Sequence, residues 1–239
     1  MCGHNKWSQI KRQKGVNDAK RSKVFAKLGK LITMAAKHGG EVEMNPTLKI
    51  AVDKARQSNM PADVIKKAIQ KGTGELAGGT IEEILYEAYG PEGTPLIIEA
   101  TTDNNNRTVS EVKHILSKNG GRLGESGSVK WMFDRFGYAE ITRTATMDME
   151  MVEMAAIEAG AEDISALDSV VVVYMKPEDL YQVKSEIEKQ GFEISESGFE
   201  WKAKEKVKAS EELVGKIDAL FDALDEQEDV NEVYSNLED

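Results

Sequence analysis

The chain has 239 residues, of which 31 are Lys or Arg and 42 are Asp or Glu, and its formal net charge is −11. Taken whole, this charge argues against a nucleic-acid binder, because polyanions repel acidic proteins. Apolar residues make up 40% of the chain, enough for a folded core, which excludes a disordered polyelectrolyte. The single cysteine, Cys2, excludes an intramolecular disulfide and a structural zinc site built on cysteines. The start of the sequence shows no secretory signal, and the longest apolar run, Val170–Met175, is too short to span a membrane, so we expect a cytoplasmic protein.

The net charge hides a division along the chain. Residues 1–75 hold 16 basic and 6 acidic side chains, whereas residues 76–239 have a net charge of −21. An asymmetry of this size between segments is typical of proteins that bind nucleic acid or an acidic membrane surface.

The basic part of the chain predicts a helical domain behind an arm. Residues 1–17 lack a clear periodicity, and we expect an extended or loosely ordered arm there. Apolar residues at helical spacing predict a first helix from Asp18, and Asn45 followed by Pro46 is typical of the start of a second. A third helix is expected over Pro61–Gly72. The apolar stripes of the three helices can be buried only against one another, which predicts a small basic three-helix domain.

A glycine-rich linker at 72–79 precedes a change of character. Ile84–Tyr89 and Leu96–Thr101 are predicted as strands, Thr108–Lys118 as a helix and Val129–Phe133 as a further strand.

The next 67 residues, 136–202, predict a strand–helix–strand–strand–helix–strand order, which is the ferredoxin-like pattern. The expected elements are, in order, Tyr138–Thr142, Met147–Ala159, Ile164–Leu167, Val170–Met175, Pro177–Gln190 and Phe192–Trp201.

The C-terminal stretch offers a helix, Glu211–Leu224, and a short strand around Val230–Tyr234. Two elements cannot form a domain, so we expect them to pack on the middle domain. The fold class is therefore α+β and multidomain, with an N-terminal basic three-helix domain followed by two α/β sandwich domains, one of them ferredoxin-like. The expected domains are 1–79, 80–134 joined with 203–239, and 135–202.

The sequence shows few residue patterns that are typical of a catalytic site. The histidines His4, His38 and His114 have no paired spacing, and the carboxylates are spread over predicted helix surfaces. The glycine-rich segments follow helices, whereas a dinucleotide-binding loop follows a strand. We therefore predict no catalytic residue, no metal site and no cofactor, and we expect a protein that is not an enzyme.

A polar loop joins a predicted strand to a predicted helix, and its side chains Asp103, Asn104, Asn106 and Arg107 are candidates for binding a partner. The alternative is an asparagine-rich turn that caps the following helix.

The arm and the first helix carry the strongest functional signal. Residues 1–37 contain ten Lys and Arg residues against one acidic residue, Asp18, and Trp7 could stack on a base. The alternative is a solvated lysine face with Trp7 docked on the body, but such a face normally mixes charge signs. Membrane-surface binding is less favoured, because the helix needs its apolar face for the core. The candidate nucleic-acid-binding residues are His4, Lys6, Trp7, Lys11, Arg12, Lys14, Lys20, Arg21, Lys23 and Lys27.

Short motifs along nearly the whole chain resemble the YebC/PmpR family, whose mitochondrial relatives include the translational activator of cytochrome c oxidase subunit I. The departures are small, such as Ser22 where the family usually has Gly. The motifs that carry the resemblance are Gly3-His4-Asn5-Lys6-Trp7, Ile10-Lys11, the run from Asp18 to Lys23 with Phe25, Asn59-Met60-Pro61, Lys71-Gly72-Thr73-Gly74, Tyr89-Gly90-Pro91, Thr102-Asp103-Asn104, Asn106-Arg107-Thr108 and Gly127-Ser128-Val129.

The resemblance implies three domains, with the middle one completed by the C-terminus, and a role in gene expression without catalysis. Our leading hypothesis is a nucleic-acid-binding regulator, specifically a DNA-binding transcriptional regulator. The alternative is a ribosome-associated translation factor that binds ribosomal RNA and aids translation of proline-rich sequences. It draws support from the acidic body, which limits contact along a duplex, and from the absence of a clear helix-turn-helix with a polar reading helix. A third hypothesis is a protein–protein adaptor that works through the acidic domains.

Overall fold

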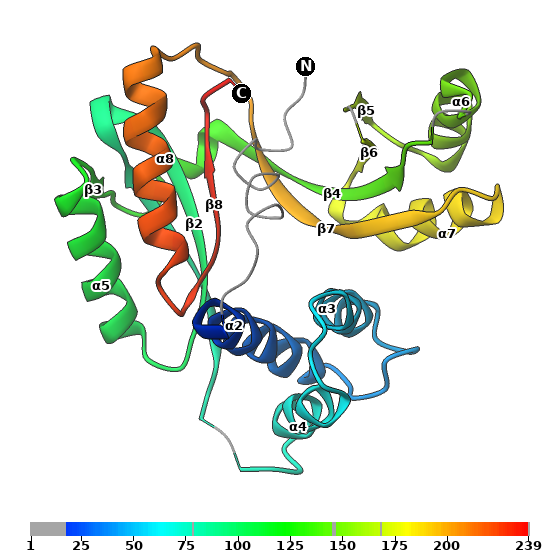
Figure 1. Cartoon of the computed structure of the whole chain (residues 1–239), viewed down its shortest axis with the longest axis horizontal. Helices are drawn as coiled ribbons and strands as arrows, with labels where there is room; N and C mark the ends of the chain where they lie inside the picture. The colour runs from blue at the N-terminus through cyan, green and yellow to red at the C-terminus, as the bar shows by residue number, and fades with distance from the viewer. Residues whose placement is uncertain (1–17, 78, 145–146, 168, 239) are drawn as a thin grey trace. The chain divides into compact units, whose positions relative to one another are not determined.

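The computed structural model describes residues 18–77, 79–144, 147–167 and 169–238. They divide into two compact units, one of residues 18–132 with 203–238 and the other of residues 133–202 (Figure 1). The first unit has two hydrophobic cores, one among its first three helices and the other between its sheet and two further helices. The finer division of the chain into three domains, 1–79, 80–134 with 203–239, and 135–202, stays a prediction.

The three predicted helices of the basic segment are present as α2 (Asp18–Ala36), α3 (Pro46–Gln57) and α4 (Ala62–Gly72). Asn45 caps α3, since its side chain accepts a hydrogen bond of 3.1 Å from the backbone N–H of Leu48. The apolar stripes of the helices meet in one cluster. Its fully buried members include Ile32, Leu48, Val52 and Ala55.

The sheet of the first unit has the strand order β3-β1-β2-β8, and its neighbouring strands run antiparallel. Helices α5 and α8 cover one of its faces, as Figure 1 shows. The elements are β1 (Glu82–Tyr89), η1 (Pro91–Gly93), β2 (Pro95–Thr102), α5 (Asn105–Lys118), β3 (Arg122–Leu123), η2 (Lys130–Met132), α8 (Glu211–Asp225) and β8 (Val230–Ser235).

The C-terminal segment completes this sheet, as the sequence predicts. Strand β8 pairs with β2 in a register that places Ile98 opposite Val233. Helix α8 contributes four buried apolar side chains to the core that α5 and the sheet also line: Ile217, Leu220, Phe221 and Leu224. These residues, more than a hundred positions from β1 and β2, close the core.

The expected strand at Val129–Phe133 is wrong. Residues Lys130–Met132 form a short 3-10 helix, and the next strand begins at Phe133. The buried carboxylate of Glu87 accepts hydrogen bonds of 2.6 Å from the backbone N–H groups of Val129 and Lys130. Those N–H groups are therefore not available for a sheet ladder.

The second unit is ferredoxin-like, as predicted. Its sheet has the strand order β5-β6-β4-β7, so that the first and third strands of the unit are central neighbours. Strand β6 is buried on both faces, which explains its uninterrupted apolar sequence. The elements are β4 (Phe133–Thr142), α6 (Met149–Ala159), β5 (Asp163–Ala166), β6 (Val170–Met175), η3 (Pro177–Asp179), α7 (Leu180–Lys189) and β7 (Ile194–Ala203).

We predict that Phe221→Ala destabilises the first unit. The Phe221 ring is 2% exposed within the core beneath α8, and removal of a buried aromatic side chain costs about 3–5 kcal/mol. Denaturant unfolding followed by circular dichroism measures the change. Val214→Ala, on the same helix at a side chain that is 37% exposed, is the control and should change the free energy of unfolding by less than about 1 kcal/mol. Equal effects of the two substitutions would contradict the packing of α8 on the sheet.

Candidate nucleic-acid interface

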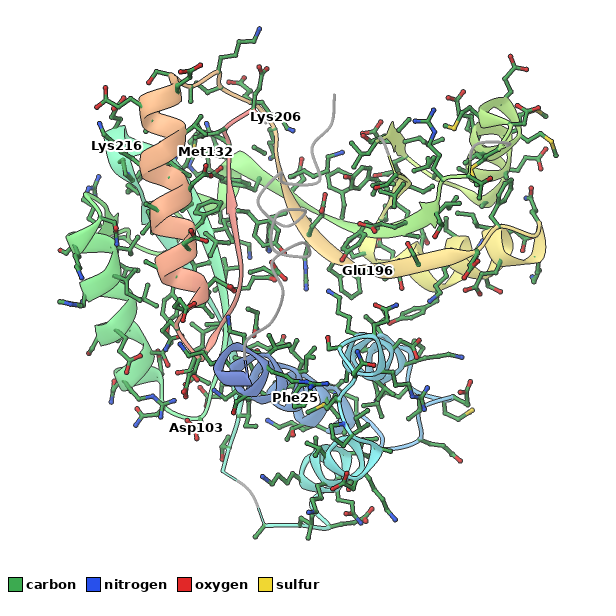
Figure 2. The ribbon with its side chains drawn as sticks, viewed as in Figure 1. Phe25, Asp103, Met132, Glu196, Lys206 and Lys216 are labelled. Atoms are coloured by element: carbon green, nitrogen blue, oxygen red, sulfur yellow. The ribbon has the colours of Figure 1, made fainter. Side chains whose placement is uncertain are left out.

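Six of the ten predicted nucleic-acid-binding residues lie outside the described residues. They are His4, Lys6, Trp7, Lys11, Arg12 and Lys14. Lys20 belongs to α2, but its side chain is also outside the described set. The structure describes the side chains of Arg21, Lys23 and Lys27. Arg21 is exposed, and its guanidinium lies 5.7 Å from the ring centroid of Phe25, which Figure 2 labels on α2.

The lysine face of α2 is bound to an acidic turn, the residues 225–229 between α8 and β8. Lys23 forms an ion pair of 2.7 Å with Glu226, and Lys27 forms one of 3.0 Å with Asp225. Lys30, one turn further along, forms an ion pair with Asp229. Spacings of four and three residues place the three lysines on one face of the helix. This face therefore has a partner within the protein before any nucleic acid binds.

Asp229 is the centre of the contact between α2 and the sheet region of the first unit, by which we mean the sheet β3-β1-β2-β8 with α5 and α8. Its side chain is fully buried, and its carboxylate accepts hydrogen bonds from Thr108 at 2.7 Å and from Arg107 at 2.9 Å as well as from Lys30. Gln227 donates a further bond of 3.3 Å. Both oxygens of the buried carboxylate thus accept hydrogen bonds, one from α2 and α5 and the other from α5 and from the acidic turn itself.

Burial by itself would raise the pKa of the Asp229 carboxyl, because the charged form loses its hydration. The hydrogen bonds from Lys30, Thr108 and Arg107 and the charge of Lys30 outweigh burial, and they hold the pKa well below its usual value. The same ion pair raises the pKa of Arg107. Asp229 is therefore ionised at neutral pH and neutralises two cations of the predicted functional segments.

The predicted partner loop is largely a helix start. Asn104 caps α5, since its side chain accepts a bond of 3.2 Å from the backbone N–H of Arg107. Asp103, labelled in Figure 2 where the chain leaves β2, forms an ion pair of 3.0 Å with Arg107. Asn106 is exposed. Capping and ion pairing account for three of the four candidate residues, which favours the alternative of a capping turn.

A second basic surface, whose residues are not among those predicted from the sequence, lies on α4. Lys66, Lys67 and Lys71 are exposed, and within the described residues none of them has an ion-pair partner. Ile65 and Ala68 are buried on the other side of the helix. The apolar periodicity of the segment was sufficient to place the three lysines on the outer face of the helix. With only three lysines, however, the segment did not stand out as a candidate binding site.

The described part of the chain shows neither a helix long and apolar enough to cross a bilayer nor a cluster of three or more His, Cys, Asp or Glu side chains placed to hold a metal ion.

No feature of the sequence indicated that the carboxylates of Asp229 and Glu87 would be important. A single carboxylate in a polar run or a strand does not reveal that it will be buried.

Comparisons with known proteins give matches over nearly the whole chain. A sequence model described as the TACO1/YebC protein N-terminal domain matches residues 5–75, and one described as the TACO1/YebC second and third domain matches residues 81–237. A protein of Fervidobacterium nodosum named "probable transcriptional regulatory protein" is 50% identical over 100% of this chain and 94% of its own length. A protein of the same name from Thermotoga maritima is 46% identical with the same coverage. The crystal structure of a conserved hypothetical protein from Aquifex aeolicus has a TM-score of 0.87 and 43% identity, and the match covers 98% of this chain and 97% of that one.

We predict that Asp229→Asn lowers the free energy of unfolding of the first unit by about 2 kcal/mol at pH 7, because Lys30 and Arg107 lose their anionic partner. The folded-state pKa is depressed below the unfolded value of about 3.9, so this stabilisation is complete above about pH 5 and is lost as the pH falls below about 4. Chemical unfolding of both proteins between pH 3 and pH 7 measures the difference. It should shrink in acid, whereas Asp222→Asn, at an exposed position of α8, should have little effect at any pH. A difference that does not depend on pH would contradict the role of the Asp229 charge.

Proposed function

This chain belongs to the TACO1/YebC family, and from that premise we propose that it is a nucleic-acid-binding regulator of gene expression that acts on DNA in transcription, in the cytoplasm and without catalysis. The names of its relatives support a regulatory role, since the proteins from Fervidobacterium nodosum and Thermotoga maritima are both called probable transcriptional regulatory proteins. Each match extends over the full length of this chain.

The observation that carries nucleic-acid binding is the exposed lysine stripe of α4. Lys66, Lys67 and Lys71 project from a domain whose described residues, 18–75, contain twelve basic and six acidic side chains. Lysines without an internal partner can neutralise phosphates and release their counterions, which is the main source of affinity for nucleic acid. The interface that we propose therefore adds Lys66, Lys67 and Lys71 to the binding residues predicted from the sequence.

The residues predicted from the sequence have different roles in this interface. The arm residues and Lys20 with Arg21 are kept as phosphate contacts. Lys23 and Lys27 can bind a phosphate only by giving up their ion pairs with Glu226 and Asp225. We therefore assign them to binding the acidic turn and expect a smaller contribution to nucleic-acid affinity.

The connection between α3 and α4 favours DNA. Although the sequence shows no clear helix-turn-helix, four residues, 58–61, join the two helices in the structure, which is the turn length of such a unit. Asn59 has a φ of 58°, the left-handed conformation that lets the chain reverse sharply between the helices. Helix α4 then presents polar side chains outward, as a helix that reads the major groove must.

Ribosomal RNA is the alternative target, with a role in translating proline-rich sequences, and the acidic turn favours it. Because residues 225–229 neutralise one face of α2, the exposed basic surface of the described residues is narrow. The remainder of the chain, residues 76–239, has a net charge of −21, so a duplex lying along it would meet carboxylates. A folded RNA can be contacted through a narrow surface by shape and stacking.

We predict that replacing Lys66 and Lys67 together with Gln weakens nucleic-acid binding about tenfold at 0.1 M salt, because two phosphate contacts are lost. For a wild-type protein with about six phosphate contacts, log affinity should fall against log salt with a slope near −5, and the variant slope should be shallower by about two. Fluorescence anisotropy with labelled DNA and RNA gives both numbers.

The matched control for this experiment is the pair Lys113→Gln and Lys118→Gln, two exposed lysines on α5 in the same unit. The control should bind as the wild-type protein does. A wild-type slope near zero would exclude both nucleic-acid functions and leave the protein–protein adaptor, whereas equal losses in the two variants would remove α4 from the interface.

The choice between DNA and ribosomal RNA is tested by crosslinking in cells followed by sequencing of the bound nucleic acid. If the protein regulates transcription, promoter DNA should be enriched, and the enrichment should fall in the Lys66 and Lys67 variant. Recovery of ribosomal RNA in place of promoter DNA would establish the translational alternative and exclude the transcriptional one.

A further inference from the structure

Trp131 is a large aromatic side chain held at the surface. It is 65% exposed, and its indole N–H donates a hydrogen bond of 3.1 Å to the carbonyl oxygen of Ser128. The hydroxyl of Tyr89 donates to the same oxygen at 3.2 Å, so the polar ends of the two side chains meet at one atom. With its only polar group already paired, the indole has an apolar ring to offer to a ligand.

The loop that carries Trp131 is fixed by a buried carboxylate. Glu87 accepts bonds of 2.6 Å from the backbone N–H groups of Gly127, Val129 and Lys130. Burial would raise the pKa of Glu87, but these donors outweigh it and lower the pKa. The carboxylate is therefore charged and holds the loop in one conformation.

Gly124 shows how closely this loop is packed. A Cβ atom at Gly124 would lie 2.6 Å from the Ser128 hydroxyl, closer than real Cβ atoms approach, and would make a tight contact of 3.2 Å with the Glu87 carbonyl oxygen. The backbone N–H of Gly124 donates to that same carbonyl at 2.8 Å. An aromatic ring on a preorganised loop loses little conformational entropy on binding, which is the condition for an efficient contact.

Basic residues are frequent in the two segments that meet at this loop, residues 122–132 and 203–208. The guanidinium of Arg122 lies 4.4 Å from the ring centroid of Tyr89. The backbone of Lys204 donates a bond of 2.9 Å to the carbonyl of Met132, and Figure 2 labels Met132 and Lys206 at the same end of the unit. Residues 122–132 and 203–208 together hold five Lys and Arg residues against two Glu, in a part of the chain that is otherwise strongly acidic.

We propose that Trp131 is a stacking platform for an unpaired base of a nucleic acid, with Arg122, stacked on Tyr89, neutralising the adjacent phosphate. This inference rests on the proposed nucleic-acid-binding function and adds a second contact point to it, away from the basic helical domain. Only an unpaired base has a free face for the indole, so the platform selects single-stranded or looped segments. The basic residues of segments 122–132 and 203–208 favour a nucleic acid over an apolar protein surface as the occupant.

The first test compares Trp131→Ala with the wild-type full chain on three labelled probes of one sequence: single-stranded RNA, single-stranded DNA and the DNA duplex. Loss of one base stack should weaken single-strand binding about tenfold and leave duplex binding unchanged. Trp131→Phe should retain most of the affinity, because a phenyl ring still stacks. Leu76→Ala, at another exposed apolar position, is the control and should have no effect.

A second measurement reports stacking directly. The chain has three tryptophans, so a variant with Trp7→Phe and Trp201→Phe emits from Trp131 alone. Stacking of a base on the indole should quench this emission as single-stranded RNA or DNA is added, and the stronger response identifies the preferred sugar. Circular dichroism shows whether this variant keeps its fold. If it does not, iodide quenching is compared between the wild-type protein and Trp131→Phe, each with and without the probe, and the difference is the contribution of Trp131.

The outcomes separate this inference from the proposed function. If the wild-type protein binds none of the probes, the proposed function fails together with the platform. Only the platform is overturned if the wild-type protein binds, Trp131→Ala binds equally well, and the probe does not change the emission of Trp131 in the variant with Trp7→Phe and Trp201→Phe. It is also overturned if Trp131→Ala abolishes association with a protein partner while its affinity for every nucleic-acid probe remains that of the wild type.

Discussion

The buried carboxylate of Asp229 organises the first unit. It receives Lys30 from α2, Arg107 and Thr108 from α5, and Gln227 from its own turn, and so it joins the three-helix segment to the sheet region. Removal of any one donor would leave a buried charge with fewer partners, which is costly in a medium of low dielectric constant. The positions of α2, of the start of α5 and of β8 are therefore coupled through one side chain.

This coupling determines which cations remain available. The acidic turn, residues 225–229, forms ion pairs with the lysine face of α2, and α2 packs against α3 and α4 through its apolar stripe. The lysines of α4 lie on the far side of that helix from the core and keep no internal partner among the described residues. A segment with a high density of positive charge thus has two faces with different roles, one that binds the protein's own carboxylates and one directed to solvent.

Glu87 plays a corresponding part at the other end of the sheet. By accepting three backbone N–H groups from residues 127–130, it replaces a strand by a tight turn and holds Trp131 at the surface. In both places a carboxylate within the sheet region determines what a neighbouring basic or aromatic segment can present. The sheet region of the first unit therefore does more than balance the charge of the basic segment, since its buried carboxylates shape the surfaces that we propose to bind nucleic acid.

Local patterns in the sequence were sufficient for most of the fold. Asn45 and Pro46 marked the start of α3, the stripe of Ile65 and Ala68 predicted α4, and the order of elements after residue 135 predicted the ferredoxin-like unit, because periodicity, capping and turn residues act over a few positions. The strand expected at Val129–Phe133 failed because the competing acceptor, Glu87, lies some forty residues away. The pairing of Lys23 and Lys27 with residues 225–229 joins positions about two hundred apart, and only the folded chain brings them together. The sequence by itself thus determined most of the elements and the division of charge. The tertiary structure decided which charges meet, since ion pairs and buried carboxylates depend on distance in space and not on distance along the chain.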